Sequence, residues 1–387
     1  MRGASETERC RTSRRLVTLA LLAMLGHVGC TRGPAAPERV RVDDLSVVLV
    51  VLDAAGARYV GALGNPLPTS PNIDALARDG GTLFERAYAQ SAWTLPSAAS
   101  FLTGRYPPRR GQDRTIVEGE TLPTLLHEAG FQTAAFSENP HVTAHFGFAR
   151  GFDVFREYFP ESLFHEDPRF YRVESARTTT DAVAWLEANQ QGRFFLYVHL
   201  LAPHSPYQPP APFGGRFDPD YTGPVDGVTD TLLRINEGTL AVSERDLEHL
   251  RLRYQENLAY GDHQMGRLLD ALRRTGRFDR TIVIVAADHG EAFREHGWML
   301  HTTTLYEEMI HVPLVIRFPP RIGRLPARWK GVVELRDMVP TLCDALQLTC
   351  SVGAERSLLR LMRLRRRPRA PRGRGRPTPV RSRSRRW

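Results

Sequence analysis

The chain contains little cysteine, with four residues among 387. Cys10 and Cys30 lie near the N-terminus, whereas Cys343 and Cys350 lie toward the other end. No group of cysteines has the spacing of a structural zinc site, which argues against a zinc-finger or zinc-ribbon fold. Cys343 and Cys350 flank a predicted turn. They either pair in an oxidising compartment or remain two free thiols, and the sequence leaves both alternatives open.

The apolar run near the N-terminus is short. Residues 16–25 are too few to span a bilayer. Arginines precede the run, and small residues and Cys30 follow it, which is typical of an export signal. HVGC, ending at Cys30, is similar to a bacterial lipoprotein processing site. We therefore predict a lipoprotein-type signal peptide over residues 1–30 and a linker over 31–44. The expected location is the periplasm or the bacterial envelope, with membrane attachment through lipidated Cys30. Cleavage near Cys30 without lipid, or an uncleaved anchor, are the alternatives.

Acidic residues are absent from the end of the chain. Residues 361–387 hold twelve arginines and no aspartate or glutamate. Removing this segment from the formal charge of +9 leaves residues 1–360 at about −3. The high pI of the whole chain therefore does not indicate a nucleic-acid partner, and we expect none. The Arg- and Pro-rich residues 351–387 show no apolar periodicity, so we predict that they form a disordered tail.

A buried strand followed by metal-ligand residues marks the centre of the chain. TIVIVAA, residues 281–287, is apolar and β-branched, as a buried parallel strand is. It is followed by Asp288, His289 and Gly290, and carboxylate and imidazole groups both bind Zn²⁺ or Mn²⁺. A polar loop then carries Glu295, His296 and His301 before a second apolar strand. In open α/β sheets the ligand crevice lies at the carboxyl ends of strands, so this pattern predicts a metal-centred active site.

Two earlier segments supply further candidates. Residues 45–53, LSVVLVVLD, predict a buried strand that ends in the carboxylate of Asp53. In SAWTLPSAASFLTGRYP, Thr94 is a good helix N-cap and Pro96 suits the first helical turn. The N-terminus of such a helix directs its amides at a bound anion. Thr94 is therefore either a reactive residue at an anion site or only a helix cap.

Together these motifs resemble the sulfatases and related phosphoesterases of the alkaline-phosphatase superfamily. The resemblance rests on DHGEAFREHGWMLH, LYEE and HVPLVIRFP, and on the first strand and the TLPSA…LTGR segment, and it covers residues 45–359. It implies an α/β fold with a doubly wound, mostly parallel sheet and helices on both faces, with a catalytic domain at 45–350. The family's C-terminal subdomain is expected to be largely missing. The basic tail stands in its place, either as a functional segment or, as we prefer, as the product of a truncated or misread gene.

The resemblance also implies a site. One divalent metal ion would be held by Asp53, Thr94, Asp288 and His289. Mixed oxygen and nitrogen ligation favours Mn²⁺ or Zn²⁺, while Ca²⁺ and Mg²⁺ remain alternatives. Many family members carry a second acid after the first aspartate, where this chain has Ala54. This difference moves the expected substrate toward phosphonate and phosphodiester enzymes.

Thr94 decides the expected chemistry. Sulfatases convert a Cys or Ser at this position into formylglycine, and threonine cannot be that precursor. Ala98 also replaces the arginine of the modification signal. A metal-activated Thr94 would instead attack phosphorus directly. We therefore expect a hydrolase or transferase that acts on a small anionic ester, preferably of phosphate or phosphonate. A sulfatase that uses unmodified Thr94, or an inactive envelope or binding protein, are the alternatives.

Two histidines complete the expected site. His204 in APHSPY and His301 match substrate-side histidines of the family, which would bind the ester and serve its leaving group, although Ala202 replaces the usual aspartate. Asn139 is a candidate substrate ligand or a turn residue. His199 is predicted to be a hydrogen-bonded core residue. Asp262 and His263 are neighbours in a predicted long helix, so they should point in different directions rather than share a metal.

Overall fold

A mixed sheet of nine strands forms the centre of the described part of the chain. Its order is β11-β2-β10-β6-β1-β5-β3-β4, and β9 pairs with β2. Strand β10 runs antiparallel to β2 and β6, and β9 runs antiparallel to β2, whereas the remaining pairs are parallel. A separate pair, β7 and β8, forms a small antiparallel ribbon. The strands are β1 Ser46–Leu52, β2 Gly81–Tyr88, β3 Gln132–Ser137, β4 Val154–Glu157, β5 Phe194–Leu200, β6 Thr281–Ala286, β7 Ala292–Phe293, β8 Met299–Leu300, β9 His311–Val312, β10 Leu314–Arg317 and β11 Arg328–Glu334.

The central strands of the sheet are buried on both faces. Every residue of β1, β5 and β6 is buried. Such strands consist of continuous apolar runs because neither face meets water. The strands predicted from LSVVLVVLD and TIVIVAA are therefore confirmed as β1 and β6, which pair directly in parallel.

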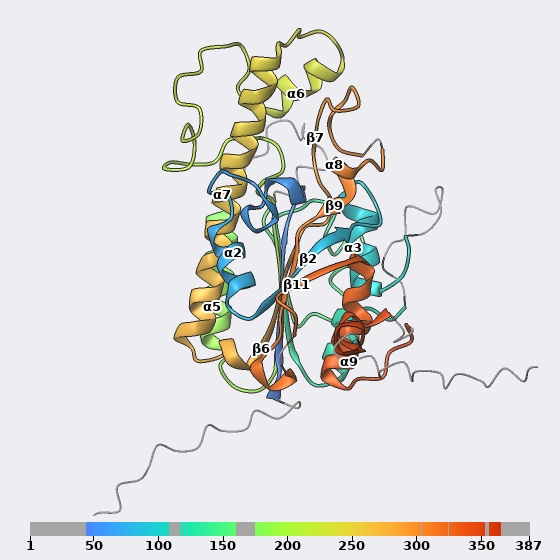
Figure 1. Cartoon of the computed structure of the whole chain (residues 1–387). Helices are drawn as coiled ribbons and strands as arrows, with labels where there is room; N and C mark the ends of the chain where they lie inside the picture. The colour runs from blue at the N-terminus through green and yellow to red at the C-terminus, as the bar shows by residue number, and fades with distance from the viewer. Residues whose placement is uncertain are drawn as a thin grey trace, which may run out of the picture. The chain divides into compact units, whose positions relative to one another are not determined.

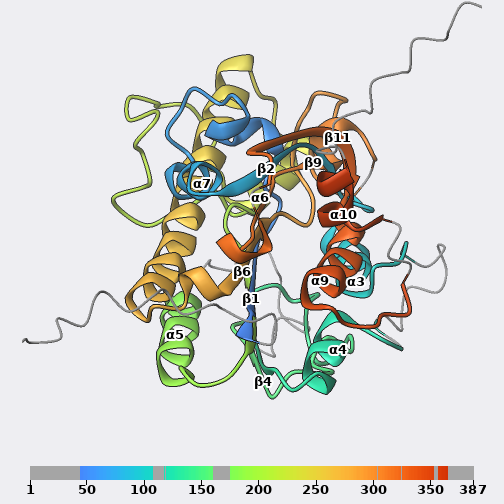
Figure 2. The same ribbon diagram turned by 60° about the horizontal axis from the view of Figure 1, so that its bottom comes forward.

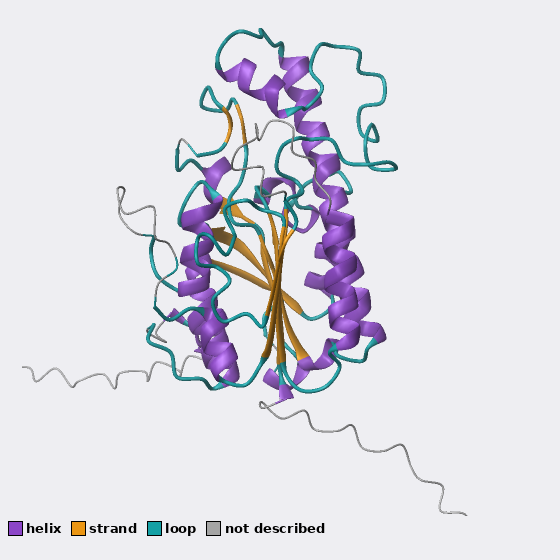
Figure 3. Ribbon diagram, turned by 180° about the vertical axis from the view of Figure 1, so that it is seen from behind, coloured by secondary structure: helices purple, strands orange, loops and turns teal. Residues whose placement is uncertain are grey.

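Helices cover both faces of the sheet, as Figures 1 and 3 show. Helices α2, α5 and α7 pack together on one face, and α3, α4, α9 and α10 lie on the other, where Figure 2 shows them from the end. This arrangement confirms the doubly wound, mostly parallel α/β fold with helices on both faces. The helices are α2 Pro71–Arg78, α3 Thr94–Thr103, α4 Leu122–Glu128, α5 Ser175–Ala188, α6 Thr229–Asn236, α7 Glu244–Arg274, α8 Glu307–Ile310, α9 Met338–Leu346 and α10 Leu358–Leu364.

The computed structural model describes residues 44–107, 117, 119–159, 175–302, 304–323, 325–352 and 356–364. The predicted signal peptide, Cys30 and the tail beyond residue 364 lie outside these ranges. Within them, no helix has both the length and the apolar character that a membrane crossing requires.

The residues beyond the predicted boundary at 350 include a further helix, α10. Helix α10 packs against α9, and its residues Leu358, Leu359 and Met362 are buried. A pattern of three apolar residues on one side of a short helix is easily missed beside the arginines that follow. Cys343, in the last turn of α9, is joined to Cys350 by a disulfide, with the two Cα atoms 6.3 Å apart. The structure therefore supports the alternative in which these two cysteines pair.

The long helix α7 organises one face of the sheet. Ser243 and Asp246 form a capping box at its start, in which each side chain accepts a hydrogen bond from the backbone nitrogen of the other residue. Farther along, the carboxylate of Asp262 accepts hydrogen bonds from the backbone nitrogens of Asn72 (3.0 Å) and Ile73 (2.9 Å). Asp262 therefore caps helix α2 from another helix, and the side chain of Ser70 does not. His263 instead lies near the ring of Phe213, so Asp262 and His263 do not share a site.

Replacing Asp262 should weaken the packing of α2 against α7. In Asp262→Ala, two backbone N–H groups at the start of α2 lose their acceptor, and burial keeps water from replacing it. We expect the free energy of unfolding to fall by about 1–3 kcal/mol, measured by urea denaturation. Asp270→Ala, which removes an exposed carboxylate from the same helix, is the matched control. An equal loss in both variants would contradict the assignment of the cap to Asp262.

Candidate active site

The predicted site residues gather at one edge of the sheet. Asp53 follows β1, Asn139 follows β3, His204 follows β5 and Asp288 follows β6, while Thr94 is the first residue of α3. These strands run parallel, so their carboxyl ends lie at the same edge. The topology therefore brings together side chains that lie far apart in the sequence.

Two buried carboxylates face one imidazole. His289 Nε2 lies 3.4 Å from Asp53 Oδ1 and 3.5 Å from Asp288 Oδ2. Asp288 Oδ1 accepts hydrogen bonds from the backbone nitrogens of Ala54 (3.1 Å) and His289 (2.9 Å), which leaves Oδ2 to face the centre. Ala54, at the position of the second acid in many relatives, therefore contributes its N–H and no carboxylate.

Thr94 lies inside this cluster. Its Oγ1 is 3.2 Å from His289 Nε2 and accepts a hydrogen bond from Asn139 Nδ2 at 3.1 Å. Thr94 is 3% exposed and occupies the first position of α3 after Trp93, where its side chain caps nothing. The structure therefore does not bear out the prediction of Thr94 as a helix cap.

The tautomer of His289 follows from its other nitrogen. Nδ1 lies 2.9 Å from the carbonyl oxygen of Gly290, which can only accept a hydrogen bond. Nδ1 therefore carries the proton of the neutral ring, and Nε2 presents a lone pair to the cluster. Burial lowers the pKa of His289, which favours this neutral form.

His199 also belongs to the cluster, which the sequence did not reveal. Its Nδ1 forms a 2.8 Å hydrogen bond with the Tyr197 hydroxyl, as expected for a core histidine. Its Nε2, however, lies 3.4 Å from Asp53 Oδ2 and 3.8 Å from Asp288 Oδ2. Asp53, His199 and Asp288 are fully buried and place their ligand atoms within 4.8 Å of one another.

The carboxylate of Asp53 and the neighbouring imidazoles shift each other's pKa. Burial alone would raise the pKa of Asp53, but His204 and His199 hold it well below its usual value. Burial disfavours the charged form of His199, yet the Asp53 and Asp288 carboxylates outweigh it and raise the pKa of this imidazole. The site therefore holds the ionised Asp53 carboxylate in a buried setting, which a bound cation would stabilise.

The donor set suits a divalent cation. Asp53 Oδ1, Asp288 Oδ2 and His199 Nε2 are buried and have no hydrogen-bond partner within the described ranges. Oxygen and imidazole donors that converge in this way are those of Mn²⁺ and Zn²⁺ sites. The residues predicted as metal ligands, Asp53, Thr94, Asp288 and His289, are therefore brought together with His199 beside them.

A second layer of histidines borders the cluster. The ring centroid of His301 lies 4.3 Å from that of His289 and 4.9 Å from that of His204. His301 Nδ1 lies 2.9 Å from Glu291 Oε1, and His204 Nδ1 lies 2.6 Å from the carbonyl oxygen of Ser205. Burial lowers the pKa of His301 to about 3 and raises that of Glu291 to about 7. His204 and His301 thus lie together beside His289.

Two residues of the same loop lie elsewhere. Glu295 pairs with Arg58 and accepts a hydrogen bond from the backbone nitrogen of Phe293. His296 lies 2.6 Å from Glu308 and stacks on Tyr306. These interactions give Glu295 and His296 structural roles that the sequence pattern did not distinguish from site roles.

The carboxyl of Glu138 lies next to the site. Its Oε2 accepts hydrogen bonds from the backbone nitrogen of Leu201 (2.7 Å) and the hydroxyl of Ser175 (2.8 Å). Complete burial outweighs these bonds and raises the pKa of Glu138 to about 7. Glu138 thereby connects the ends of β3 and β5 to the start of α5.

Glu138→Gln should change how stability depends on pH. A carboxyl whose pKa is higher in the folded than in the unfolded state stabilises most below the unfolded pKa. Its contribution declines as pH rises through the folded pKa. Between pH of about 4.5 and 7, the native protein should lose up to about 3 kcal/mol that the variant keeps. Urea denaturation with a chelator present measures this, and parallel pH profiles for the two proteins would contradict it.

Comparison with known proteins shows which family the chain resembles. The sulfatase family model matches residues 46–348. Iduronate 2-sulfatase of Homo sapiens is 28% identical over 380 residues, which span 82% of this chain and 67% of that protein. An arylsulfatase of Clostridium perfringens is 26% identical and spans 80% of this chain and 76% of its own length.

The fold has counterparts among solved structures. The phosphonate monoester hydrolase of Agrobacterium radiobacter superposes with a TM-score of 0.62 at 24% identity, over 79% of this chain and 74% of that one. This likeness is one of fold. The family match, by contrast, spans most of the chain and runs from the first strand of the sheet to the residues after α9. The chain therefore belongs to the sulfatase family.

Proposed function

We propose that this protein is a metal-dependent ester hydrolase of the sulfatase family in which unmodified Thr94 is the nucleophile. Its preferred substrates are phosphate or phosphonate esters. The observation that carries the proposal is the position of the Thr94 hydroxyl, between Asn139 and His289 and beside two buried carboxylates with unsatisfied oxygens. A residue that served only packing would not need such surroundings.

A bound divalent cation would lower the pKa of the Thr94 hydroxyl and offset the charge of the substrate anion. Asp53, Asp288, His289 and Thr94 would hold it, and His199 lies where it adds a further nitrogen donor. Asn139, which donates to both Asp53 and Thr94, keeps the Thr94 oxygen directed at the cluster.

Catalysis then proceeds in two displacements. Thr94 Oγ1 releases its proton to water and forms a bond to phosphorus, while the bond from phosphorus to the ester oxygen breaks. His204 donates a proton to the departing alcohol, and His301 binds the oxygens of the transferred group. Water, or an alcohol acceptor in a transferase reaction, then attacks phosphorus, breaks the Oγ1–P bond and restores Thr94.

Phosphorus is preferred because of how the covalent intermediate must break down. Formylglycine expels sulfate by elimination, a route that requires a second oxygen on the nucleophile carbon. Threonine carries only a single oxygen on that carbon, so this elimination is closed to it. Its ester must instead be resolved by attack of water on the central phosphorus or sulfur atom. The curated sulfatase relatives favour a second candidate, sulfate ester hydrolysis with the same residues. An inactive binding protein is the third.

The N-terminal sequence supports a proposal for the cellular location of the protein. A lipoprotein-type signal at residues 1–30 would export the chain and attach it through Cys30 to the bacterial envelope, where small anionic esters would reach the site.

A substrate panel tests the function. The purified protein, supplied in turn with Mn²⁺, Zn²⁺, Mg²⁺ and Ca²⁺, is assayed on aryl phosphate monoesters and diesters, a phosphonate ester and an aryl sulfate. We expect turnover of phosphoryl or phosphonyl esters that a chelator abolishes. Equal or faster turnover of the sulfate would replace our substrate preference with the second candidate. Absence of turnover and of metal binding by folded protein would favour the third.

A further inference from the structure

A second polar pocket lies at the opposite edge of the sheet. It has a volume of about 560 Å³ and is lined by residues that precede the central strands. Gly130 comes before β3, Arg193 before β5, Asp44 before β1 and Arg280 before β6. Because these strands run parallel, the pocket lies about 20 Å, the length of a seven-residue strand, from the edge that carries Thr94. It is therefore separate from the candidate active site.

The lining is strongly cationic. Arg193, Arg277 and Arg280 stand against one acidic residue, Asp44. In the described part of the chain, no ion pair joins any of these three arginines to a carboxylate. The neighbouring acid Asp279 is already bonded to Arg317 at 2.6 Å. The pocket thus concentrates positive charge that the surrounding side chains leave uncompensated.

Arg277 is the buried member of the group. It is 6% exposed, its guanidinium lies 5.0 Å from the Phe194 ring centroid, and its NH2 donates to Gly192 O (2.5 Å) and Ser46 Oγ (3.0 Å). Its Nε has no hydrogen-bond partner within the described ranges. Burial, and after it the charge of Arg280, lowers the pKa of Arg277, although an arginine stays charged. A buried guanidinium next to a second one is costly without an anion.

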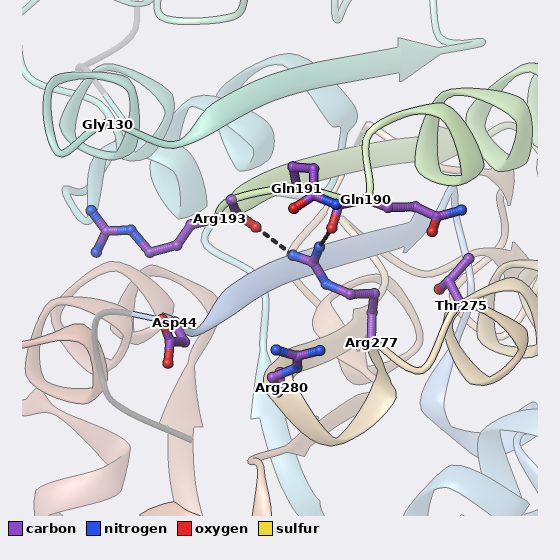
Figure 4. A pocket seen from close by; sticks show the side chains of 9 residues that line it. Asp44, Gly130, Gln190, Gln191, Arg193, Thr275, Arg277 and Arg280 are labelled. Atoms are coloured by element: carbon purple, nitrogen blue, oxygen red, sulfur yellow. Dashed lines mark hydrogen bonds between the residues drawn. The ribbon is translucent and has the colours of Figure 1, made fainter. Parts of the chain in front are cut away.

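Figure 4 shows how the pocket is arranged. Arg277 is bonded to the backbone of the loop that carries Gln190 and Gln191, and Arg280 and Asp44 lie on its other side. The amide side chains of Gln190 and Gln191 line the same pocket and add neutral donors and acceptors to it. Planar guanidinium groups match the oxygens of phosphate and sulfate better than ammonium groups do.

We propose that this pocket is a binding site for the oxyanion of a phosphate or sulfate ester, held by Arg277 and Arg280. The Arg193 side chain donates to the carbonyl oxygen of Ala129, points away from these two arginines and borders the pocket (Figure 4). Its volume exceeds that of the bare anion and lies in the range of small-molecule sites, so the remainder of the ligand is a polar group that the amides of Gln190 and Gln191 contact. The same oxyanion occurs on free metabolites and on lipid headgroups. Neither source is a substrate at this site, because the Thr275 hydroxyl that lines it donates to the carbonyl oxygen of Ala271 and no cluster of metal ligands stands beside it among the lining residues.

Binding measurements on the full chain test this site. Inorganic phosphate, inorganic sulfate and a monosaccharide phosphate are titrated by calorimetry in the presence of a chelator, and vesicles of phosphatidylcholine with and without phosphatidylglycerol are sedimented with the protein. The variant is Arg280→Glu, which places a carboxylate beside Arg277 and so supplies an internal counter-ion. Arg321→Glu makes the same charge change at an exposed position outside the pocket.

We expect at least one oxyanion probe to bind the native protein and the Arg321→Glu variant alike. Affinity in Arg280→Glu should fall by about tenfold or more, the loss of one charge-assisted hydrogen bond. Ester turnover should be unchanged in Arg280→Glu, so the two proposals fail separately. Arg280-dependent capture by anionic vesicles alone identifies a lipid headgroup as the source. Absence of binding by every probe, or binding that Asp288→Asn removes and Arg280→Glu keeps, would overturn the proposal.

Discussion

Thr94→Ala should lower kcat by at least about a thousandfold on any ester that the native protein hydrolyses. The substitution removes the only atom that attacks the substrate in the proposed mechanism. The backbone of α3, the carboxylates and the histidines remain in place, because the Thr94 side chain caps no helix and, within the described ranges, forms hydrogen bonds only with Asn139 and His289. KM should change far less than kcat.

Two further variants at the same position separate chemistry from packing. Thr94→Val keeps the shape of the side chain without its hydroxyl and should be as inactive as Thr94→Ala. Thr94→Ser keeps the hydroxyl and should retain measurable activity. Removal of a true nucleophile lowers kcat by far more than about tenfold. A Thr94→Val variant that kept more than about a tenth of native kcat would therefore show that Thr94 is not the nucleophile.

Asp288→Asn should abolish the response of the protein to metal ions and, with it, activity. A cation that binds only the folded state stabilises it by about 4 kcal/mol at a thousandfold excess over its Kd. We expect added Mn²⁺ or Zn²⁺ to raise the Tm of the native protein and to leave that of Asp288→Asn unchanged. Metal content after dialysis should fall in parallel.

The same variant should be more stable than the native protein in a chelator. Asp288 Oδ2 is then a buried charged oxygen without a hydrogen-bond partner, whereas the asparagine amide can donate to the lone pair of His289 Nε2, 3.5 Å from that position. Asp262→Asn changes another buried carboxyl outside the site and should keep the metal response. A native protein that gains no stability from any of the four metals would contradict the metal-centred account.

The sequence predicted those site residues that stand at the ends of strongly apolar runs. Asp53 and Asp288 follow LSVVLVVL and TIVIVAA, and parallel strands bring such ends to one edge. Family motifs supplied Thr94, His204 and His301, and the structure places all three around the carboxylates.

The position of His199 in the site could not be predicted from the sequence. Inside the strand FFLYVHL, period-two alternation assigns a face to each side chain but not what that face meets. Only the pairing of β1 between β5 and β6 reveals that Nε2 of His199 is directed at Asp53 and Asp288. An apolar strand with one histidine gives no sign of this.

Long-range polar contacts were equally invisible. Asp262 caps α2 across 190 positions of sequence, and Glu138 binds both Ser175 and the backbone of Leu201. Such bonds depend on how helices dock on the sheet, and local propensity contains no information about docking. For the loop residues Glu295 and His296 the sequence suggested site residues where the structure has ion pairs. A sequence pattern cannot distinguish a site ligand from a member of a surface ion pair.

The most direct test of the account is to trap the covalent intermediate. The protein, loaded with the metal that supports turnover, is mixed with an aryl phosphate or phosphonate, quenched in acid and digested. The peptide that contains Thr94 is then analysed by mass spectrometry. The account predicts a phosphoryl or phosphonyl group on Thr94 that is absent without substrate and absent with a chelator. Steady turnover during which the Thr94 peptide stays unmodified at every quench time, while another residue carries the phosphoryl or phosphonyl group, would contradict the account.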